Sequence, residues 1–194
     1  MRHTTRGVRS AAIALIATLS FAAITSAQTA RPGAIRIDNF ARVNDSYFRG
    51  AQPAGQDYAD LAALGIKTVI NLIGDSDRDP QEASMVERQG MRYLNIPMST
   101  RVTPTAVQLD QFLALVNDAA SQPVYVHCVG GSHRTGVMTA VYRMTHDGLS
   151  GAEAFQEMKQ FKYGPDFLHP EFKKFVEAFG ARRSAAAITT ATHQ

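Results

Sequence analysis

The sequence predicts a single α/β domain with a central, mostly parallel sheet and helices on both sides of that sheet. Short apolar runs typical of buried strands, such as Lys67–Ile73 and Pro123–His127, alternate with segments whose apolar residues recur at helical spacing. Strands separated by helices of about 10–15 residues are typical of βαβ units, which build parallel sheets. A length of 194 residues and an apolar fraction of 45% suit one globular domain.

The first half of the domain is expected to alternate between strands and helices. The expected strands are Phe40–Val43, Tyr47–Arg49, Lys67–Ile73 and Met91–Ile96. The first helix is expected over Gln56–Leu64 and ends at Gly65, because a glycine after the last helical turn accepts a left-handed backbone. Asp79 and Glu82 are expected to form the capping box of a second helix, which ends at Gln89.

The second half is expected to begin with a helix that opens at Thr103-Pro104. Its apolar residues have helical spacing and are expected to face the core: Val107, Leu109, Phe112, Leu113 and Val116. The buried strand Pro123–His127 follows, and a glycine-rich loop connects it to a helix over Thr135–His146. Sites in parallel sheets form at the carboxyl ends of the strands, which is where this loop lies.

Two further helices are expected to close the domain. Ser150 and Glu153 have the spacing of a capping box, which starts a helix that ends near Phe161. The last helix is expected over Pro170–Phe179, and the Ala/Thr-rich residues 181–194 are expected to form a flexible tail.

The first 27 residues have the pattern of a secretory signal peptide. An apolar run, Ala11–Ile24, follows a basic start, and the small residues Thr25–Ala27 precede a cleavage point. The run is shorter than the roughly 20 residues that a membrane-spanning helix needs. We therefore expect removal of residues 1–27, which leaves a polar lead over 28–39 and the domain over 40–180 in the periplasm or outside the cell.

The mature chain is expected to be close to electrically neutral. The signal removes three arginines and no acidic residue from a chain with 20 Lys+Arg and 17 Asp+Glu. Without that basic charge, we expect no nucleic-acid partner. A single cysteine excludes an internal disulfide framework and a cysteine-rich zinc site. We expect a monomer with no metal, no cofactor and no membrane association after signal cleavage.

The glycine-rich loop carries the candidate chemistry. Cys128 and Arg134 bracket five residues, which are Val129, Gly130, Gly131, Ser132 and His133. If the loop curls, its backbone N–H groups point at one centre, and the next helix adds the partial positive charge of its N-terminus. The guanidinium of Arg134 is suited to two oxygens of a phosphoryl group. We therefore expect Cys128 to act as a thiolate below a binding site that these five residues and Arg134 form for a tetrahedral dianion.

This arrangement predicts phosphoryl transfer to sulfur, followed by hydrolysis of the thiophosphate by water. Cys128 is the expected nucleophile, and Arg134 binds the transferred group. Thr135 can donate a hydrogen bond to the sulfur and stabilise it as the leaving group of the second step. His127 can hydrogen-bond backbone near the sulfur and hold it in place.

The segment HCVGGSHRTG resembles the phosphate-binding loop of cysteine-dependent protein tyrosine and dual-specificity phosphatases. That signature is His-Cys, five residues, Arg, Ser or Thr, and Gly. Because His133 stands directly before the arginine, the loop is similar to that of the atypical dual-specificity phosphatases of plants and fungi. Some of those enzymes act on inositol polyphosphates and pyrophosphates. The likeness spans Phe40 to about Phe179 and includes the segments 47–53 (YFRGAQP) and 65–72 (GIKTVINL).

The resemblance implies an exported phosphomonoesterase with a cysteinyl-phosphate intermediate, which acts on a phosphorylated protein or a small phosphoester. Such enzymes usually carry a general acid, an Asp, roughly 30 residues before the cysteine, but residues 96–104 (IPMSTRVTP) contain no carboxylate. We assign the role to Asp75, with Asp77 as an equal alternative in the same loop. Asp79 and Asp166 are weaker candidates.

Three other functions stay open at this point. Inositol polyphosphates or pyrophosphates could be the substrates, although Ser132 stands where the atypical subgroup often has lysine. Arg101, and less strongly Arg78, could replace that positive charge. The loop could also bind phosphate without catalysis. Sulfur transfer or arsenate reduction fits less well, because Arg134 and Thr135 favour phosphate and arsenate reduction usually needs further cysteines.

Overall fold

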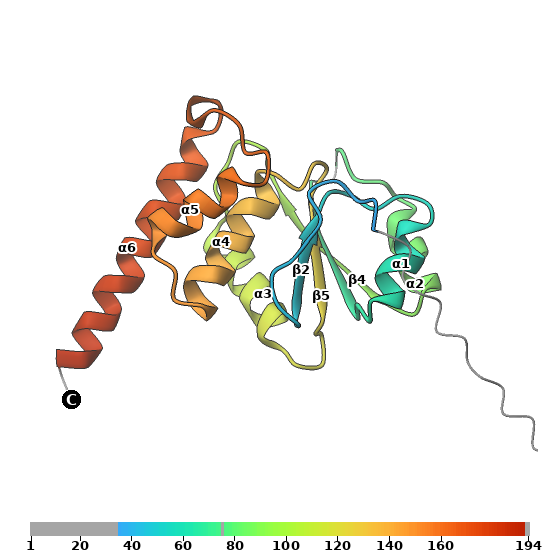
Figure 1. Cartoon of the computed structure of the whole chain (residues 1–194), viewed down its shortest axis with the longest axis horizontal. Coiled ribbons are helices and arrows are strands. Elements are labelled where there is room, and N and C mark those ends of the chain that lie inside the picture. Colours follow the sequence, from blue (N-terminus) through green and yellow to red (C-terminus); the bar gives the residue numbers. More distant parts are fainter. Residues whose placement is uncertain (1–34, 75, 193–194) are drawn as a thin grey trace, which may run out of the picture. The chain divides into compact units, whose positions relative to one another are not determined.

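The computed structural model describes residues 35–74 and 76–192, and a five-stranded sheet forms its centre (Figure 1). The strand order across the sheet is β1-β2-β5-β3-β4. The strands are β1 (Ala41–Arg42), β2 (Tyr47–Gly50), β3 (Thr68–Ile73), β4 (Arg92–Met98) and β5 (Val124–His127). β1 pairs antiparallel with β2, and every other neighbouring pair is parallel. The predicted mostly parallel sheet is confirmed.

Helices cover both faces of the sheet, as the sequence predicts (Figure 1). Helices α1 (Asp57–Ala63) and α2 (Glu82–Arg88) pack on one face, and α3 (Ala106–Asn117) and α4 (Arg134–His146) pack on the other. Two more helices, α5 (Gly151–Lys159) and α6 (Pro170–Thr192), pack on the outer side of α4. A short 3₁₀ turn, η1 (Asp166–Leu168), precedes α6.

The central strands β3 and β5 are buried along their whole length, which explains their almost continuous apolar sequences. Successive side chains alternate between the two faces of the sheet. Ile70 and Leu72 accordingly pack in a cluster with Phe112 of α3. Val69 packs on the opposite face in a cluster with Tyr58 of α1. The carboxyl ends of these strands meet at one edge of the sheet.

The first turn of α3 differs from the prediction. Thr105 is the N-cap and forms a capping box with Gln108, so the helix begins at Ala106 rather than at Thr103-Pro104. Val107 was expected to face the core, but it is 64% exposed, so that prediction is wrong. The physical reason is its position two residues before Leu109, which places it on nearly the opposite side of the helix.

The predicted capping box of α2 is also wrong. Gln81 is the N-cap and makes no side-chain cap. Asp79 instead accepts a hydrogen bond from the backbone N–H of Gln81 at 2.8 Å. Glu82 is completely buried, because its carboxylate points into the protein toward His127. The predicted capping box of Ser150 and Glu153 at the start of α5 is confirmed.

The two ends of the domain extend beyond the predicted boundaries. Ile37 is only 7% exposed and packs in the cluster that contains Tyr125, so part of the predicted lead over 28–39 belongs to the folded unit. At the other end, α6 continues to Thr192, where the sequence predicts a helix end at Phe179 and a flexible tail. The predicted signal peptide lies outside the described residues. None of the described helices is long and apolar enough to cross a membrane.

Candidate active site

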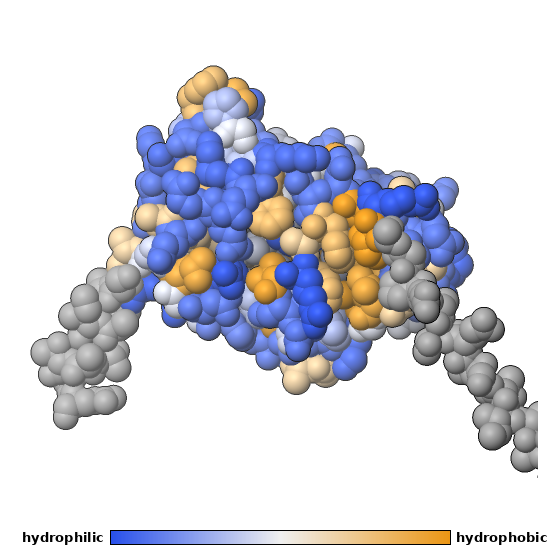
Figure 2. Space-filling model, viewed as in Figure 1, coloured by the Kyte–Doolittle hydropathy of each residue, from blue (hydrophilic) through white to orange (hydrophobic). Residues whose placement is uncertain are grey.

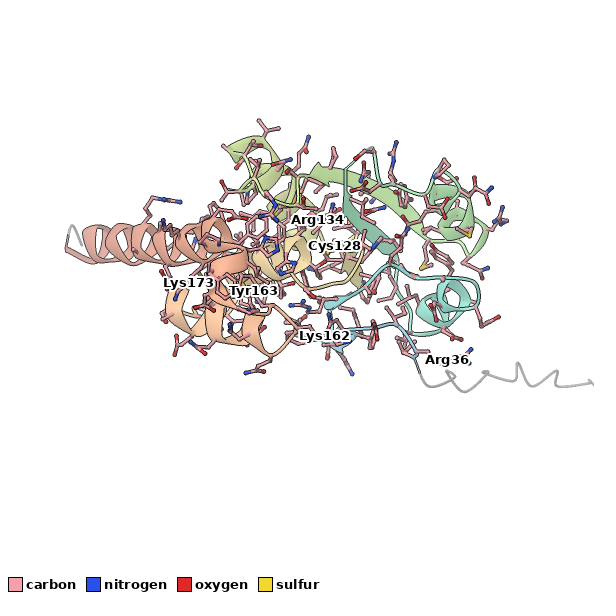
Figure 3. All side chains as sticks on the ribbon, turned by 90° about the horizontal axis from the view of Figure 1, so that it is seen from above. Arg36, Cys128, Arg134, Lys162, Tyr163 and Lys173 are labelled. Carbon is pink, nitrogen blue, oxygen red and sulfur yellow. The ribbon has the colours of Figure 1, made fainter. Side chains whose placement is uncertain are left out.

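The glycine-rich loop leaves the carboxyl end of β5 and enters α4, and it surrounds a cavity of about 240 Å³. Figure 3 shows Cys128 and Arg134 close together at this point of the fold. The cavity is lined by Thr100, Cys128, Val129, Gly130, Ser132, His133 and Arg134. Cys128 and Arg134 are 3% and 5% exposed, so nucleophile and cation lie largely out of water. The structure thus brings together most of the site residues that the sequence predicts.

Gly131 does not line the cavity. It has a φ of +69°, and a Cβ at this position would lie 2.5 Å from the carbonyl carbon of Gly50 and 2.7 Å from the nitrogen of Ala51. The loop therefore packs directly on the backbone at the end of β2. Only glycine fits there, because any side chain would meet a backbone that cannot move aside.

Arg134 is fixed by backbone at the end of β4. Its Nη1 donates a hydrogen bond to the carbonyl oxygen of Met98 at 3.3 Å. This contact orients the guanidinium and leaves its other N–H groups for a ligand in the cavity.

Thr135 lies in the first turn of α4 and is completely buried. Its hydroxyl has no hydrogen-bond partner among the described residues. The hydroxyl is thus available for the expected bond to the sulfur of Cys128.

His133 connects the loop to the segment before α6. Its Nε2 lies 2.9 Å from the carbonyl oxygen of Tyr163, and because a carbonyl can only accept, Nε2 carries the hydrogen. The His133 ring also contacts the His169 ring, with centroids 3.8 Å apart. Burial lowers the pKa of His133, which favours the neutral ring. His133 therefore contributes a neutral polar edge to the cavity.

His127 does not have the expected contact with backbone near the sulfur. Its Nε2 lies 3.0 Å from Oε1 of Glu82, and both side chains are fully buried. The Glu82 carboxylate also accepts a hydrogen bond from the side-chain amide of Asn71. The prediction that His127 bonds to backbone near the sulfur is therefore wrong. Its side chain points to the face of the sheet that α1 and α2 cover.

The candidate general acids have different surroundings. Asp75 lies outside the described residues. Asp77 lines a second cavity of about 310 Å³, which shares Thr100 and Arg134 with the first. Asp166 forms ion pairs with Lys159 and Lys173, and the hydrogen bonds from these two lysines lower the pKa of its carboxyl. This ion pairing keeps Asp166 ionised and unsuited to donate a proton.

Arg78 and Arg101, the candidate sources of extra positive charge, do not line the cavity around Cys128. Arg78 donates to the side-chain oxygen of Asn95 at 3.2 Å. Arg101 lies 3.5 Å from the carbonyl oxygen of Leu168.

Three donors that the sequence pattern does not predict bind the outer side of the loop. Three successive loop carbonyl oxygens accept hydrogen bonds from residues between 39 and 52, the segment that contains β1 and β2. The backbone N–H of Gln52 donates to Val129 at 3.1 Å, and the side-chain amide of Asn39 donates to Gly130 at 2.7 Å. The guanidinium of Arg49 donates to Gly131. An arginine inside an apolar strand was the one local signal for this arrangement.

Comparison with known proteins supports the same family as the loop. The family described as "DSP-PTPase phosphatase fused to NAD+ Kinase" matches residues 25–174. The dual specificity protein phosphatase TpbA of Pseudomonas aeruginosa is 30% identical over 128 residues, which cover 66% of this chain and 56% of TpbA. The inositol diphosphatase DSP2 of rice (Oryza sativa subsp. japonica) is 28% identical over 109 residues, which cover 54% of this chain and 53% of that protein.

The fold matches those of solved phosphatases. The core catalytic domain of the PP-IP phosphatase SIW14 from S. cerevisiae superposes with a TM-score of 0.66 at 21% identity, over 80% of this chain and 94% of that one. The match with TpbA spans little more than half of that curated relative's length. Because the family match covers most of the described domain and includes the Cys128–Arg134 loop, the chain belongs to the DSP-PTPase family of cysteine-dependent phosphatases.

Proposed function

We propose that this protein hydrolyses phosphomonoesters through a phosphorylated Cys128. The observation that carries the proposal is the cavity that Cys128 and Arg134 line together at the N-terminus of α4. A phosphoryl dianion in this cavity meets the guanidinium, the loop amides and the positive end of a 13-residue helix. The same charges favour the thiolate form of the nucleophile.

The reaction proceeds in two steps. In the first, the sulfur of Cys128 attacks phosphorus, the bond from phosphorus to the ester oxygen breaks, and the leaving oxygen receives a proton from a general acid. In the second, water attacks phosphorus, the sulfur–phosphorus bond breaks, and one proton of the water passes to the carboxylate formed in the first step. Orthophosphate and the thiolate are the products, and the hydroxyl of Thr135 stabilises that thiolate.

Asp77 is the general acid that the described residues support best. Asp77 lines the second cavity, which shares Thr100 and Arg134 with the cavity around Cys128, whereas Asp166 is held between two lysines. Loss of a general acid should slow hydrolysis about 10²–10⁴-fold for a poor leaving group and much less for a good one. We expect Asp77→Asn to reduce kcat on phenyl phosphate far more than on 4-nitrophenyl phosphate. Asp166→Asn is the matched control, and Asp75→Asn tests the residue outside the described range. An equal effect of Asp77→Asn on both esters would exclude Asp77.

The surroundings of the cavity favour phosphorylated tyrosine in proteins over inositol polyphosphates. Arg134 is the only lysine or arginine among the described residues that line the cavity, so additional phosphates would find little positive charge. Apolar residues lie close by: Val129 is 52% exposed on the loop itself, and Leu168 is 47% exposed beside Arg101. Figure 2 shows hydrophobic side chains projecting at the turn before α6, where Phe167 is 77% exposed. An aromatic ring and its peptide suit such a surface.

We also propose that the protein acts in the periplasm or outside the cell as a monomer. The support for export is the signal-like sequence of residues 1–27. N-terminal sequencing of protein recovered from the exported fraction should begin at Gln28. Recovery of full-length protein from the cytoplasm alone would contradict export.

A substrate panel tests the activity. Purified protein is assayed on a phosphotyrosine peptide, a phosphoserine peptide and an inositol polyphosphate, with Cys128→Ser as control. We expect highest kcat/KM on phosphotyrosine, loss of all turnover in Cys128→Ser, and inhibition by vanadate. A higher kcat/KM on the inositol polyphosphate would contradict phosphotyrosine as the proposed substrate. Tight phosphate binding without turnover would show a binding module instead.

A further inference from the structure

We propose that Arg49 is a positioning residue, a buried cation beneath the phosphate loop that directs the loop amides inward and favours negative charge in the cavity. The inference rests on the proposed function of the same site and extends it to a residue outside the cavity. Arg49 lies at the end of β2, far from Cys128 in the sequence, and is 1% exposed.

The peptide units of the loop are oriented by donors that lie outside it. The carbonyl oxygens of Val129, Gly130 and Gly131 each accept a hydrogen bond from a donor outside the loop. In a trans peptide, the carbonyl and the N–H of the same unit point in opposite directions. Holding three successive carbonyls outward therefore turns the N–H groups of the following residues toward the cavity, which is the geometry of an anion-binding nest.

Arg49 holds the residue at which the loop turns back on itself. Its guanidinium donates to Gly131, the residue whose φ of +69° reverses the chain and which packs on Gly50. A face of the guanidinium lies on the ring of Phe161, with Cζ 3.9 Å from the ring centroid. Phe161 and Gly131 thus hold the planar group from two sides.

The charge of Arg49 supports the same role. In the part of the chain that the structure describes, no carboxylate forms an ion pair with this buried guanidinium, and its Nε has no hydrogen-bond partner. Burial lowers the pKa of Arg49, and the nearby Tyr47, Cys128 and Glu157 act in the opposite direction. Negative charge on the sulfur that lines this cavity would be stabilised by Coulomb attraction to the buried cation. A phosphoryl dianion in the cavity would receive the same stabilisation.

The test compares Arg49→Met, Arg49→Lys and Asn39→Ala with wild-type protein. Methionine keeps much of the apolar volume and removes charge and donors, whereas lysine keeps the charge without the planar fork. Arg42→Met is the matched control, because Arg42 is a surface arginine of the neighbouring strand that pairs with Asp45. The readouts are calorimetric binding of orthophosphate, the rate of Cys128 alkylation by iodoacetamide below neutral pH, and thermal unfolding.

We expect Arg49→Met to weaken phosphate binding about tenfold or more and to slow the alkylation several-fold. Arg49→Lys should recover the alkylation rate, because it restores the charge, and only part of the phosphate affinity. Arg42→Met should match wild type in every readout. A folded Arg49→Met protein with wild-type phosphate affinity and alkylation would overturn the inference.

Asn39→Ala decides the question if Arg49→Met does not fold. Asn39 is only partly buried, and its side-chain amide holds the neighbouring carbonyl of Gly130. Loss of that bond should weaken phosphate binding roughly three- to tenfold with little change in alkylation. Wild-type phosphate affinity in Asn39→Ala would then overturn the inference. Phosphate binding without turnover by wild-type protein would contradict the proposed function and leave this inference intact.

Discussion

Single residues of the loop owe their orientation to partners that are distant in the sequence. His133 donates to the carbonyl oxygen of Tyr163 and contacts the ring of His169, so a side chain that lines the cavity around Cys128 is fixed by the segment before α6. Arg134 is fixed by Met98 in the same way. The loop sequence therefore supplies all the described lining residues of the cavity except Thr100, and the tertiary fold specifies how they point.

The lowered pKa of His133 predicts a pH effect on stability. Burial disfavours the protonated ring in the folded state, while the unfolded chain binds a proton near the ordinary value of 6.5. The contribution of neutral His133 to stability is thus complete above pH 6.5 and is lost as the pH falls below that value toward the lowered pKa. His133→Gln keeps a donor for Tyr163 and cannot titrate. We expect the Tm of wild type to fall more than that of His133→Gln between about pH 7 and pH 5. Parallel curves would contradict this.

At the scale of elements, the end of β2 and the phosphate loop form one packed unit. The backbone of Gly50 leaves no room for a Cβ at Gly131, whereas a Cβ at Gly130 would meet only Oγ of Ser132 at 3.9 Å. The two adjacent glycines are therefore under different constraints. One is required by close packing of two elements, and the other lies on the open side of the loop.

Gly131→Ala should destabilise the fold by about 1–3 kcal/mol, because the methyl group overlaps the backbone of β2 and the residue must keep a positive φ. Gly130→Ala adds the same methyl group without that overlap, and we expect it to leave the Tm nearly unchanged. Thermal or denaturant unfolding of both variants measures the difference. Equal Tm values for the two would contradict the close packing of loop and strand.

Most elements could be predicted from local patterns, since apolar periodicity and capping residues act over a few positions. The capping box at Ser150 and the buried strand β5 show this. The failures have longer-range causes. Glu82 has the local pattern of a cap, but its contact with His127 lies across the fold. The burial of Gly180 against Gly151 of α5 shows that α6 packs as a helix past Phe179, which the composition of the tail did not indicate.

At the scale of the whole molecule, the chain order of the sheet brings the site together. β5 lies between β2 and β3, so the loop after β5 meets Arg49 on one side and the loop that contains Asp77 on the other. Cys128 and Arg134 were predictable because the loop is continuous in sequence. Asp77 was predictable as a candidate, because the loop after β3 opens at the same edge of the sheet. Arg49 and Asn39 were not, because only the strand order makes them neighbours of the loop.

The whole chain contains a single cysteine, which determines its response to oxidation. A thiolate at Cys128 would form a sulfenic acid, and no second cysteine in the chain is present to resolve it as an internal disulfide. We expect isolated protein to gain activity when dithiothreitol is added, and mild peroxide to abolish activity reversibly. Equal activity with and without reductant would contradict a reactive thiolate at this position.

The central claim is that Cys128 becomes phosphorylated within the loop that ends at Arg134. Acid quenching of wild-type protein during turnover of 4-nitrophenyl phosphate, followed by peptide mass spectrometry, measures this directly. The account predicts one phosphoryl group on the peptide that contains Cys128, attached to the sulfur, and none on Cys128→Ser. Turnover without phosphorylation of Cys128, or undiminished turnover by Cys128→Ser, would contradict it.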